Sequence, residues 1–216
     1  LAYKNLFGLN QTVTTRTEFV LPMSGSGPLV RFVEYSGAIG YRNPYPLNVP
    51  ISFAADMVFD SYAISFLDNI IRMQTRTSFE ARVEKKLSSV MTGIFRLYHF
   101  ERTNTETLDV ASSGRVDLIG SLGPGLIVDF RDNSFNPLKG SYHLVNLEFA
   151  SPVLLSNENI SFVMLNSRST FYVPLASGLN LSVFGGVGYA KSLIPGRTVP
   201  QARLDKELAL GGRNSI

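Results

Sequence analysis

The chain has 216 residues, enough for one domain or one large closed sheet. Its 20 basic and 17 acidic residues leave a net charge of +3, with no basic run typical of nucleic-acid binding. The lack of cysteine excludes thiol catalysis, disulfides and metal–thiolate sites, and only 17% of residues are charged against 44% hydrophobic, which argues against disorder.

Alternation of apolar and polar residues with a period of two runs through most of the chain and predicts β-strands. In chain order these are 11–20, 29–42, 51–60, 71–86, 89–102, 114–131, 140–151, 161–173 and 179–189. Segments rich in Gly, Pro, Asn and Ser lie between several of them and predict turns. Helix-favouring residues occur at 201–210, but they lie inside a predicted loop, so we assign no helix there. The alternation as a whole predicts roughly nine strands.

The segment 71–86 separates its two faces most clearly. One face carries Arg72, Arg76, Glu80, Arg82 and Glu84. The other carries Ile71, Met73, Phe79 and Val83. Alternation alone fits both a soluble sandwich and a membrane barrel. Predicted strands of about ten residues, many aromatic residues and low charge favour an all-β, antiparallel transmembrane β-barrel, in which the charged face lines the lumen and the apolar face meets lipid.

Two segments carry further motifs. In 129–142 the sequence predicts a strand end, a turn and a strand restart, because proline fixes φ and glycine tolerates a positive φ. Asp129 and Arg131 are two residues apart, so they share a strand face and can interact. The candidate turn motif is Asp129, Arg131, Asp132, Asn136, Pro137 and Gly140. A solvated turn flanked by charges is the alternative interpretation.

The second segment, 208–216, contains Gly211, Gly212 and Arg213. The two glycines permit a close backbone approach, and Arg213 places a cation beside them. A plain glycine-rich loop is the alternative. A long segment without strands of its own is usually functional or disordered.

Together these two segments resemble the barrel of the BamA/TamA superfamily of outer-membrane assembly and translocation proteins. In that family an Asp-x-Arg-Asp segment and an Asn-Pro-x-x-Gly turn join two strands. A Gly-Gly run then leads to an Arg-Gly-Phe/Tyr tripeptide on an inward loop. The sequence ends at Ile216, one residue before that tripeptide would begin, so Arg213 is not its arginine. The resemblance implies that 208–216 folds into the barrel, with Asp129 a conceivable partner for Arg213. Shorter matches at 5–8, 40–45 and 172–175 follow the same order.

The resemblance implies that residues 1–216 form a partial barrel, with roughly nine of about sixteen strands. The first strand, the C-terminal strands and the upstream POTRA domains would lie outside it. It also implies a bacterial outer-membrane location and a role in folding and inserting β-barrel proteins, or in assisting their secretion. The implied partners are outer-membrane lipid, unfolded β-barrel clients and accessory lipoproteins or periplasmic proteins, with no nucleic acid.

Other classes of function have weaker support. No nucleophile-elbow, zinc-protease, phosphate-loop or dinucleotide motif occurs, so we expect no enzymatic activity, cofactor or metal. Of the two histidines, His143 falls on an apolar strand face, as an interfacial or core histidine would. A passive porin or channel is the main alternative, and a soluble β-sandwich binding module is a third.

Overall fold

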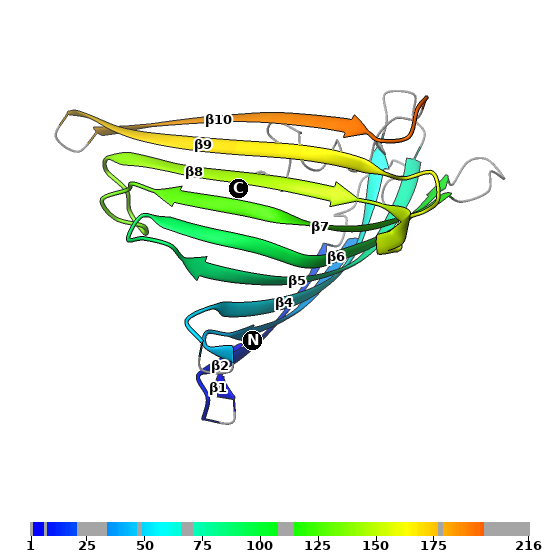
Figure 1. Cartoon of the computed structure of the whole chain (residues 1–216), viewed down its shortest axis with the longest axis horizontal. Helices are drawn as coiled ribbons and strands as arrows, with labels where there is room; N and C mark the ends of the chain where they lie inside the picture. Colours follow the sequence, from blue (N-terminus) through cyan, green and yellow to red (C-terminus); the bar gives the residue numbers. More distant parts are fainter. Residues whose placement is uncertain are drawn as a thin grey trace.

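The computed structural model describes residues 2–6, 8–20, 34–46, 49–65, 71–107, 115–176 and 179–196. Ten strands within these ranges form one antiparallel sheet in which sequence neighbours pair throughout (Figure 1). The strands are β1 (Ala2–Leu6), β2 (Gln11–Val20), β3 (Glu34–Asn43), β4 (Ser52–Ser65), β5 (Ile71–Lys86), β6 (Met91–Thr107), β7 (Arg115–Asp129), β8 (Gly140–Ala150), β9 (Phe162–Ala176) and β10 (Leu179–Ser192). The sheet curves like a barrel wall, with β1 and β10 as its two ends, and the all-β prediction is confirmed.

The sequence pattern missed one strand. β1 has five residues, too few for an alternation to be recognised, and Asn5 interrupts it with a φ of 64° beside a register shift between Lys4 and Leu6. The number of strands described is therefore ten rather than nine. β5 has the predicted bounds, whereas β4, β6 and β9 continue beyond theirs to residues 65, 107 and 176.

Because consecutive strands are antiparallel, alternate connections share one end of the sheet. We call the end with 44–51, 87–90 and 130–139 the turn end, and it lies on the left in Figure 1. We call the opposite end, where β6 ends, β7 begins and residues 151–161 connect β8 to β9, the loop end. Seven strands, β4 to β10, have 11 to 17 residues, the length that a tilted membrane-crossing strand needs.

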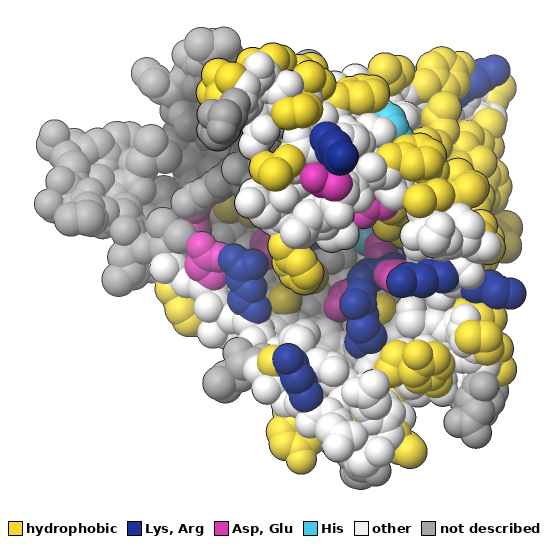
Figure 2. Space-filling model, turned by 90° about the vertical axis from the view of Figure 1, so that its left-hand side faces the viewer, with side chains coloured by type: hydrophobic (Ala, Val, Ile, Leu, Met, Phe, Trp, Pro, Cys, Tyr) yellow, Lys and Arg dark blue, Asp and Glu magenta, His cyan; other side chains and the backbone are white. Residues whose placement is uncertain are grey.

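The two faces of the sheet differ in chemistry. On β5, Glu80 and Arg82 lie on the concave face, while Phe79 lies on the convex face with 38% of its surface exposed. Seen from the turn end, acidic and basic side chains gather in a central hollow, and hydrophobic side chains crowd one flank (Figure 2). The predicted faces of 71–86 are thus confirmed for the residues whose side chains are described, which leaves out Ile71 and Arg72.

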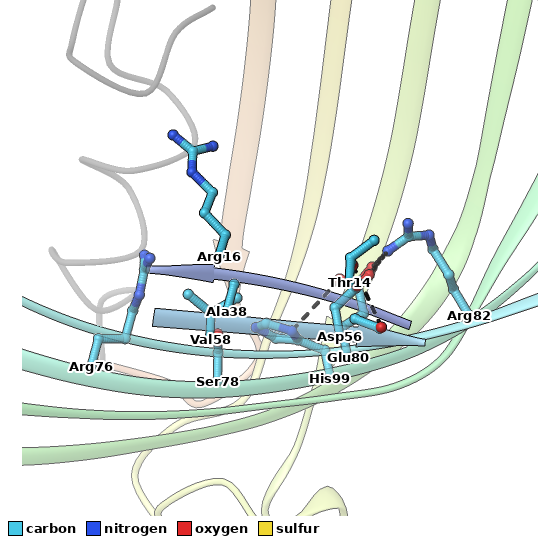
Figure 3. A pocket seen from close by; sticks show the side chains of 11 residues that line it. Thr14, Arg16, Ala38, Asp56, Val58, Arg76, Ser78, Glu80, Arg82 and His99 are labelled. Carbon is cyan, nitrogen blue, oxygen red and sulfur yellow. Dashed lines mark hydrogen bonds and ion pairs between the residues drawn. The ribbon is translucent and has the colours of Figure 1, made fainter. Parts of the chain in front are cut away.

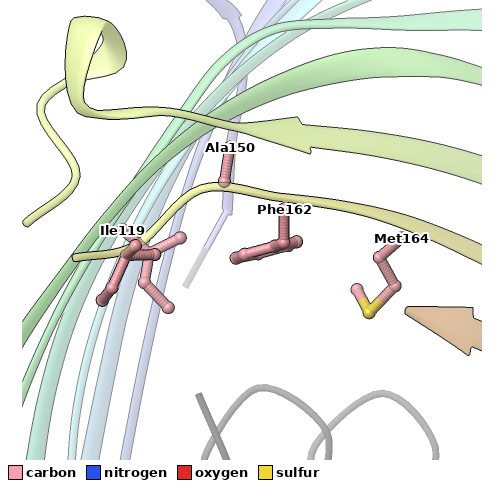
Figure 4. Close-up of a cluster of buried hydrophobic side chains, with 5 residues drawn as sticks. Ile119, Ala150, Phe162 and Met164 are labelled. Carbon is pink, nitrogen blue, oxygen red and sulfur yellow. The ribbon is translucent and has the colours of Figure 1, made fainter. Parts of the chain in front are cut away.

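The buried apolar cluster also lies on the concave face, near the loop end (Figure 4). It consists of Ile119, Ala150, Ile160, Phe162 and Met164. In register, Ile119 faces Glu101, and Met164 faces Glu148, so the cluster borders charged side chains. In the described ranges, no helix has the length and hydrophobicity to cross a membrane.

Candidate functional site on the concave face

The concave side of β2 to β6 encloses a hollow of about 350 Å³ (Figure 3). Its lining residues come from alternate positions on five strands, as period-two side chains of a curved sheet must. They are Thr14, Arg16, Ala38, Gly40, Asp56, Val58, Arg76, Ser78, Glu80, Arg82 and His99. Acidic and basic groups are interleaved here, so the surface can hold charges in place against one another.

Arg82 is the centre of this arrangement. Its Nη1 donates to Asp56 Oδ2 on β4 at 2.7 Å and to Glu80 Oε1 at 3.0 Å, and its Nε donates to Glu84 Oε1 at 3.0 Å. Cross-strand pairing places Ala54 opposite Arg82, so the guanidinium reaches diagonally to Asp56. One cation therefore joins two strands and compensates three carboxylates.

A second arginine extends the network toward β8. Arg96 Nε lies 3.0 Å from Glu80 Oε2, and its Nη1 lies 3.7 Å from Glu148 Oε2. Glu148 is 2% exposed and accepts a hydrogen bond from Ser121 Oγ at 2.6 Å. The ion pairs and hydrogen bonds thus run without interruption from β4 to β8 across the concave wall.

His99 is buried within this network. Its Nδ1 lies 3.7 Å from Glu80 Oε2 and its Nε2 lies 3.6 Å from Glu101 Oε2, while neither nitrogen makes a hydrogen bond. Ser121 faces His99 directly across β6 and β7, but its hydroxyl donates to Glu148. A serine nucleophile and its base require a hydrogen bond between them, so this Ser, His and Glu set has no catalytic-triad geometry.

No group of three or more potential metal ligands occurs among the residues that the structure describes. His143, the other imidazole, lies on the convex face, where its two nitrogens contact the Ser169 and Ser141 hydroxyls at 2.9 Å each. Its ring also packs edge-on against Phe171. His143 is therefore a polar residue with satisfied nitrogens in an apolar surface, as its position in the alternation indicated.

The turn motif begins with a bidentate ion pair. Arg131 Nε and Nη2 donate to the two carboxylate oxygens of Asp129 at 2.8 and 2.7 Å, and the guanidinium stacks 4.7 Å from the Tyr142 ring centroid. These hydrogen bonds raise the pKa of Arg131. Asp129 and Tyr142 are opposite in register, so the pair closes the turn end of the β7–β8 hairpin.

The remaining motif residues build the turn itself. Asp132 Oδ1 accepts from the backbone N–H groups of Asn133, Leu138 and Lys139 at 2.9 to 3.3 Å. Gly140 has a φ of 105°, and a Cβ there would lie 2.2 Å from the Phe130 carbonyl oxygen. Asn136 is exposed and Pro137 is half-buried. The structure thus brings Asp129 and Arg131 together and gives Asp132 and Gly140 definite conformational roles.

Gly211, Gly212 and Arg213 lie outside the described residues, so the inward position of 208–216 stays a prediction. The chain leaves β10 at the loop end, whereas Asp129 lies at the turn end and already accepts from Arg131 through both oxygens. A contact between Arg213 and Asp129 would require the segment to extend along most of the lumen.

Sequence reasoning missed much of the luminal network, notably Asp56, Arg96, Glu101, Ser121 and Glu148. Their signal is weak but present: Glu148 alternates with the convex-face residues Leu147 and Phe149 on β8. A carboxylate at a concave position of an apolar strand requires a partner on another strand. That partner could not be named without the register.

Comparison with known proteins decides the family. The model of the Omp85 superfamily domain matches residues 5–216, nearly the whole chain. The chain belongs to the Omp85 superfamily. Its fold is similar to that of BamA from Haemophilus ducreyi lacking POTRA domains 1–3, with a TM-score of 0.70 and 12% sequence identity. The alignment covers 94% of this chain and 39% of that structure, and no curated protein matches the sequence.

The resemblance inferred from the two motif segments is therefore confirmed at the level of the superfamily, and the outer-membrane location with it. In an Omp85 barrel the convex apolar face meets lipid and the concave polar face lines the lumen. The site described above is thus a luminal wall whose charges are paired across strands, together with a rigid hairpin at its turn end.

Proposed function

We propose that this Omp85 protein folds and inserts β-barrel proteins into the outer membrane, in the manner of BamA, or assists their secretion, in the manner of TamA. The observation that carries the proposal is the superfamily match over residues 5–216. The barrel-like fold shared with BamA supports it. We propose further that residues 1–216 are one part of the barrel domain, with POTRA domains upstream and additional strands on both sides.

The luminal wall fits this role better than that of a passive porin. Arg82 and Arg96 are each within 4 Å of at least two carboxylates of the wall itself. A guanidinium held by neighbouring carboxylates has little freedom to bind a passing ion. The network instead connects β4 to β8 and keeps this part of the wall rigid, while a client protein would be handled elsewhere in the barrel.

The motif residues have structural roles in the proposal. Asp129, Arg131, Asp132, Asn136, Pro137 and Gly140 fix the β7–β8 hairpin, and Gly211, Gly212 and Arg213 belong to a segment that occupies the lumen. No residue makes or breaks a bond, so no catalytic residue or cofactor is assigned. The proposed partners are outer-membrane lipid, unfolded β-barrel clients and accessory lipoproteins or periplasmic proteins.

Depletion of the full-length protein in its own bacterium tests the proposal. We expect several unrelated β-barrel proteins to disappear from the outer membrane if the role is general assembly, and a narrow set of secreted or translocated proteins to be affected if it is specialised. Large, steady single-channel conductance of the purified protein, with unchanged outer-membrane composition on depletion, would instead identify a porin.

A further inference from the structure

The connection between β8 and β9 folds back onto the convex face of the sheet. Residues 152–155, Pro-Val-Leu-Leu, form a short 3-10 turn and the left-handed residue that ends it. We call these four residues the knob. It contacts β7 at Gly120, where an added Cβ would lie 1.5 Å from the Leu154 carbonyl oxygen. In Figure 4 the turn lies on the opposite side of the sheet from the luminal side chains of Phe162 and Met164.

The knob is held firmly by side chains that replace a strand partner of β7. Ser156 Oγ accepts from Gly120 N at 2.9 Å and donates to Gly120 O at 3.0 Å. Asn157 binds the backbone of Leu118 through its own N–H and its side-chain oxygen, at 3.0 and 2.9 Å. Tyr98, on β6, adds a hydrogen bond from its hydroxyl to Leu154 O at 3.2 Å.

This fixed turn presents apolar side chains outward. Val153 is 90% exposed and Leu155 is 65% exposed, and residues 151–157 carry no charge. Flexible loops often expose single apolar residues, but a turn anchored by several backbone and side-chain hydrogen bonds displays these two at a defined place. Two exposed apolar residues do not by themselves mark an interaction surface, so the surface that adjoins them decides what they contact.

The register shows what adjoins the knob. Directly paired residues on the convex face form one row across five strands: Ile39, Met57, Phe79, Phe100 and Gly120. The knob covers the one position in this row that lacks a side chain. Arg102, two residues beyond Phe100 on the same face, is exposed and marks the approach to the polar boundary at the loop end.

We propose that the knob is a membrane wedge: Val153 and Leu155 insert among the acyl chains of the leaflet at the loop end, immediately below the headgroups. Continuity with the lipid-facing row and the absence of charge from residues 151–157 support lipid as the occupant rather than water, with the exposed Arg102 and Glu158 at the polar boundary beside them. The wedge would anchor the loop end of β7 to β9 in the bilayer and continue the apolar belt where β8 ends.

The test uses nitroxide labels on cysteines introduced into the full-length protein, reconstituted in phosphatidylethanolamine–phosphatidylglycerol vesicles. The variants are Val153→Cys, the lipid-facing control Phe79→Cys and the aqueous control Glu158→Cys, which lies exposed in the same connection. Power saturation compares collisions with oxygen, which concentrates in acyl chains, and with a water-soluble nickel chelate. Because Val153 is almost fully exposed, its replacement leaves the packing of the fold intact.

We expect the oxygen-to-nickel accessibility ratio at position 153 to exceed that at position 158 several-fold. It should stay below the ratio at position 79 if Phe79 lies nearer the bilayer midplane, because the oxygen concentration rises toward the centre of the bilayer. A ratio at 153 equal to that at 158 would place the knob in water and overturn the proposal. Low accessibility to both reagents would also overturn it, because the knob would then be covered by protein.

Discussion

Nη1 of Arg82 on β5 lies 2.7 Å from Oδ2 of Asp56 on β4, and the same guanidinium also donates hydrogen bonds to Glu80 and Glu84 of its own strand. One cation therefore contacts three carboxylates on a half-buried wall, of which Glu80 also pairs with Arg96 and Glu84 with Arg42. This central position makes Arg82 informative for testing whether the luminal network stabilises the barrel.

Replacing Arg82 with methionine should destabilise the protein. Breaking a buried ion pair costs roughly 3–5 kcal/mol, and the partial exposure of these side chains reduces the expected loss in unfolding free energy to about 2 kcal/mol. Urea titration of the full-length protein in vesicles measures the loss. The control is Arg16→Met, whose partner Glu18 forms an exposed pair that should contribute less than about 1 kcal/mol. Equal losses at both positions would exclude a stabilising network.

The two faces of β5 predict opposite tolerance to a charge. Phe79→Arg should cost roughly 2–4 kcal/mol of folding free energy if the residue lies near the bilayer midplane, because the guanidinium would enter lipid. Ser78→Arg should cost much less, since its side chain faces the polar lumen. Folding titrations into bilayers compare the two variants directly, and similar costs would show that the convex face does not meet lipid.

Gly140→Ala tests the restart of β8 after the turn. With a φ of 105° and the Phe130 carbonyl oxygen 2.2 Å from the new Cβ, the substitution should destabilise by about 1–3 kcal/mol. Gly37→Ala on β3 is the matched control, because nothing lies within 4 Å of its added Cβ. Thermal or urea unfolding of the two variants should separate them; a neutral Gly140→Ala would contradict the conformational constraint on this turn.

The Asp132 carboxylate should make the free energy of unfolding depend on pH. Desolvation raises its pKa, but donation from the backbone N–H groups of Lys139, Leu138 and Asn133 outweighs this effect and holds the pKa below its usual range. A carboxyl with a lowered folded-state pKa stabilises the fold above its unfolded-state pKa of about 3.9 and loses that effect as the pH falls through the folded value. The stability difference between the natural protein and Asp132→Asn should be constant near neutral pH and shrink below about pH 4. A difference in stability that does not change with pH would show that the charge of the Asp132 carboxylate does not stabilise the fold.

The inward position of residues 208–216 is open to chemical labelling. Cysteines introduced at Gly212 and Asn214 of the full-length protein should react slowly with a bulky external thiol reagent, because the barrel wall would shield them. Glu158→Cys, at an exposed position of the β8–β9 connection, supplies the fast-reacting reference. Rates at 212 and 214 equal to this reference would place the segment outside the barrel.

The local part of this structure follows from the sequence. Alternation in 71–86 determined both the strand and its two faces, because side chains of a strand point alternately to opposite sides whatever its neighbours are. The turn at 129–140 was also readable, since the short spacing of Asp129 and Arg131 and the conformational freedom of Gly140 are properties of the chain itself. β1 could not be predicted from the sequence, because a strand of five residues with a positive φ at Asn5 is too short and too irregular to show a period.

Tertiary structure alone decided which groups meet across strands. Glu148 and Ser121 are 27 residues apart in sequence, and Arg82 and Asp56 are 26 apart, so their contacts exist only once register is fixed. A shift of one residue would move every side chain of a strand to the other face. The knob at 152–155 likewise depends on the bare backbone of Gly120 on another strand, which no local pattern in residues 151–157 reveals.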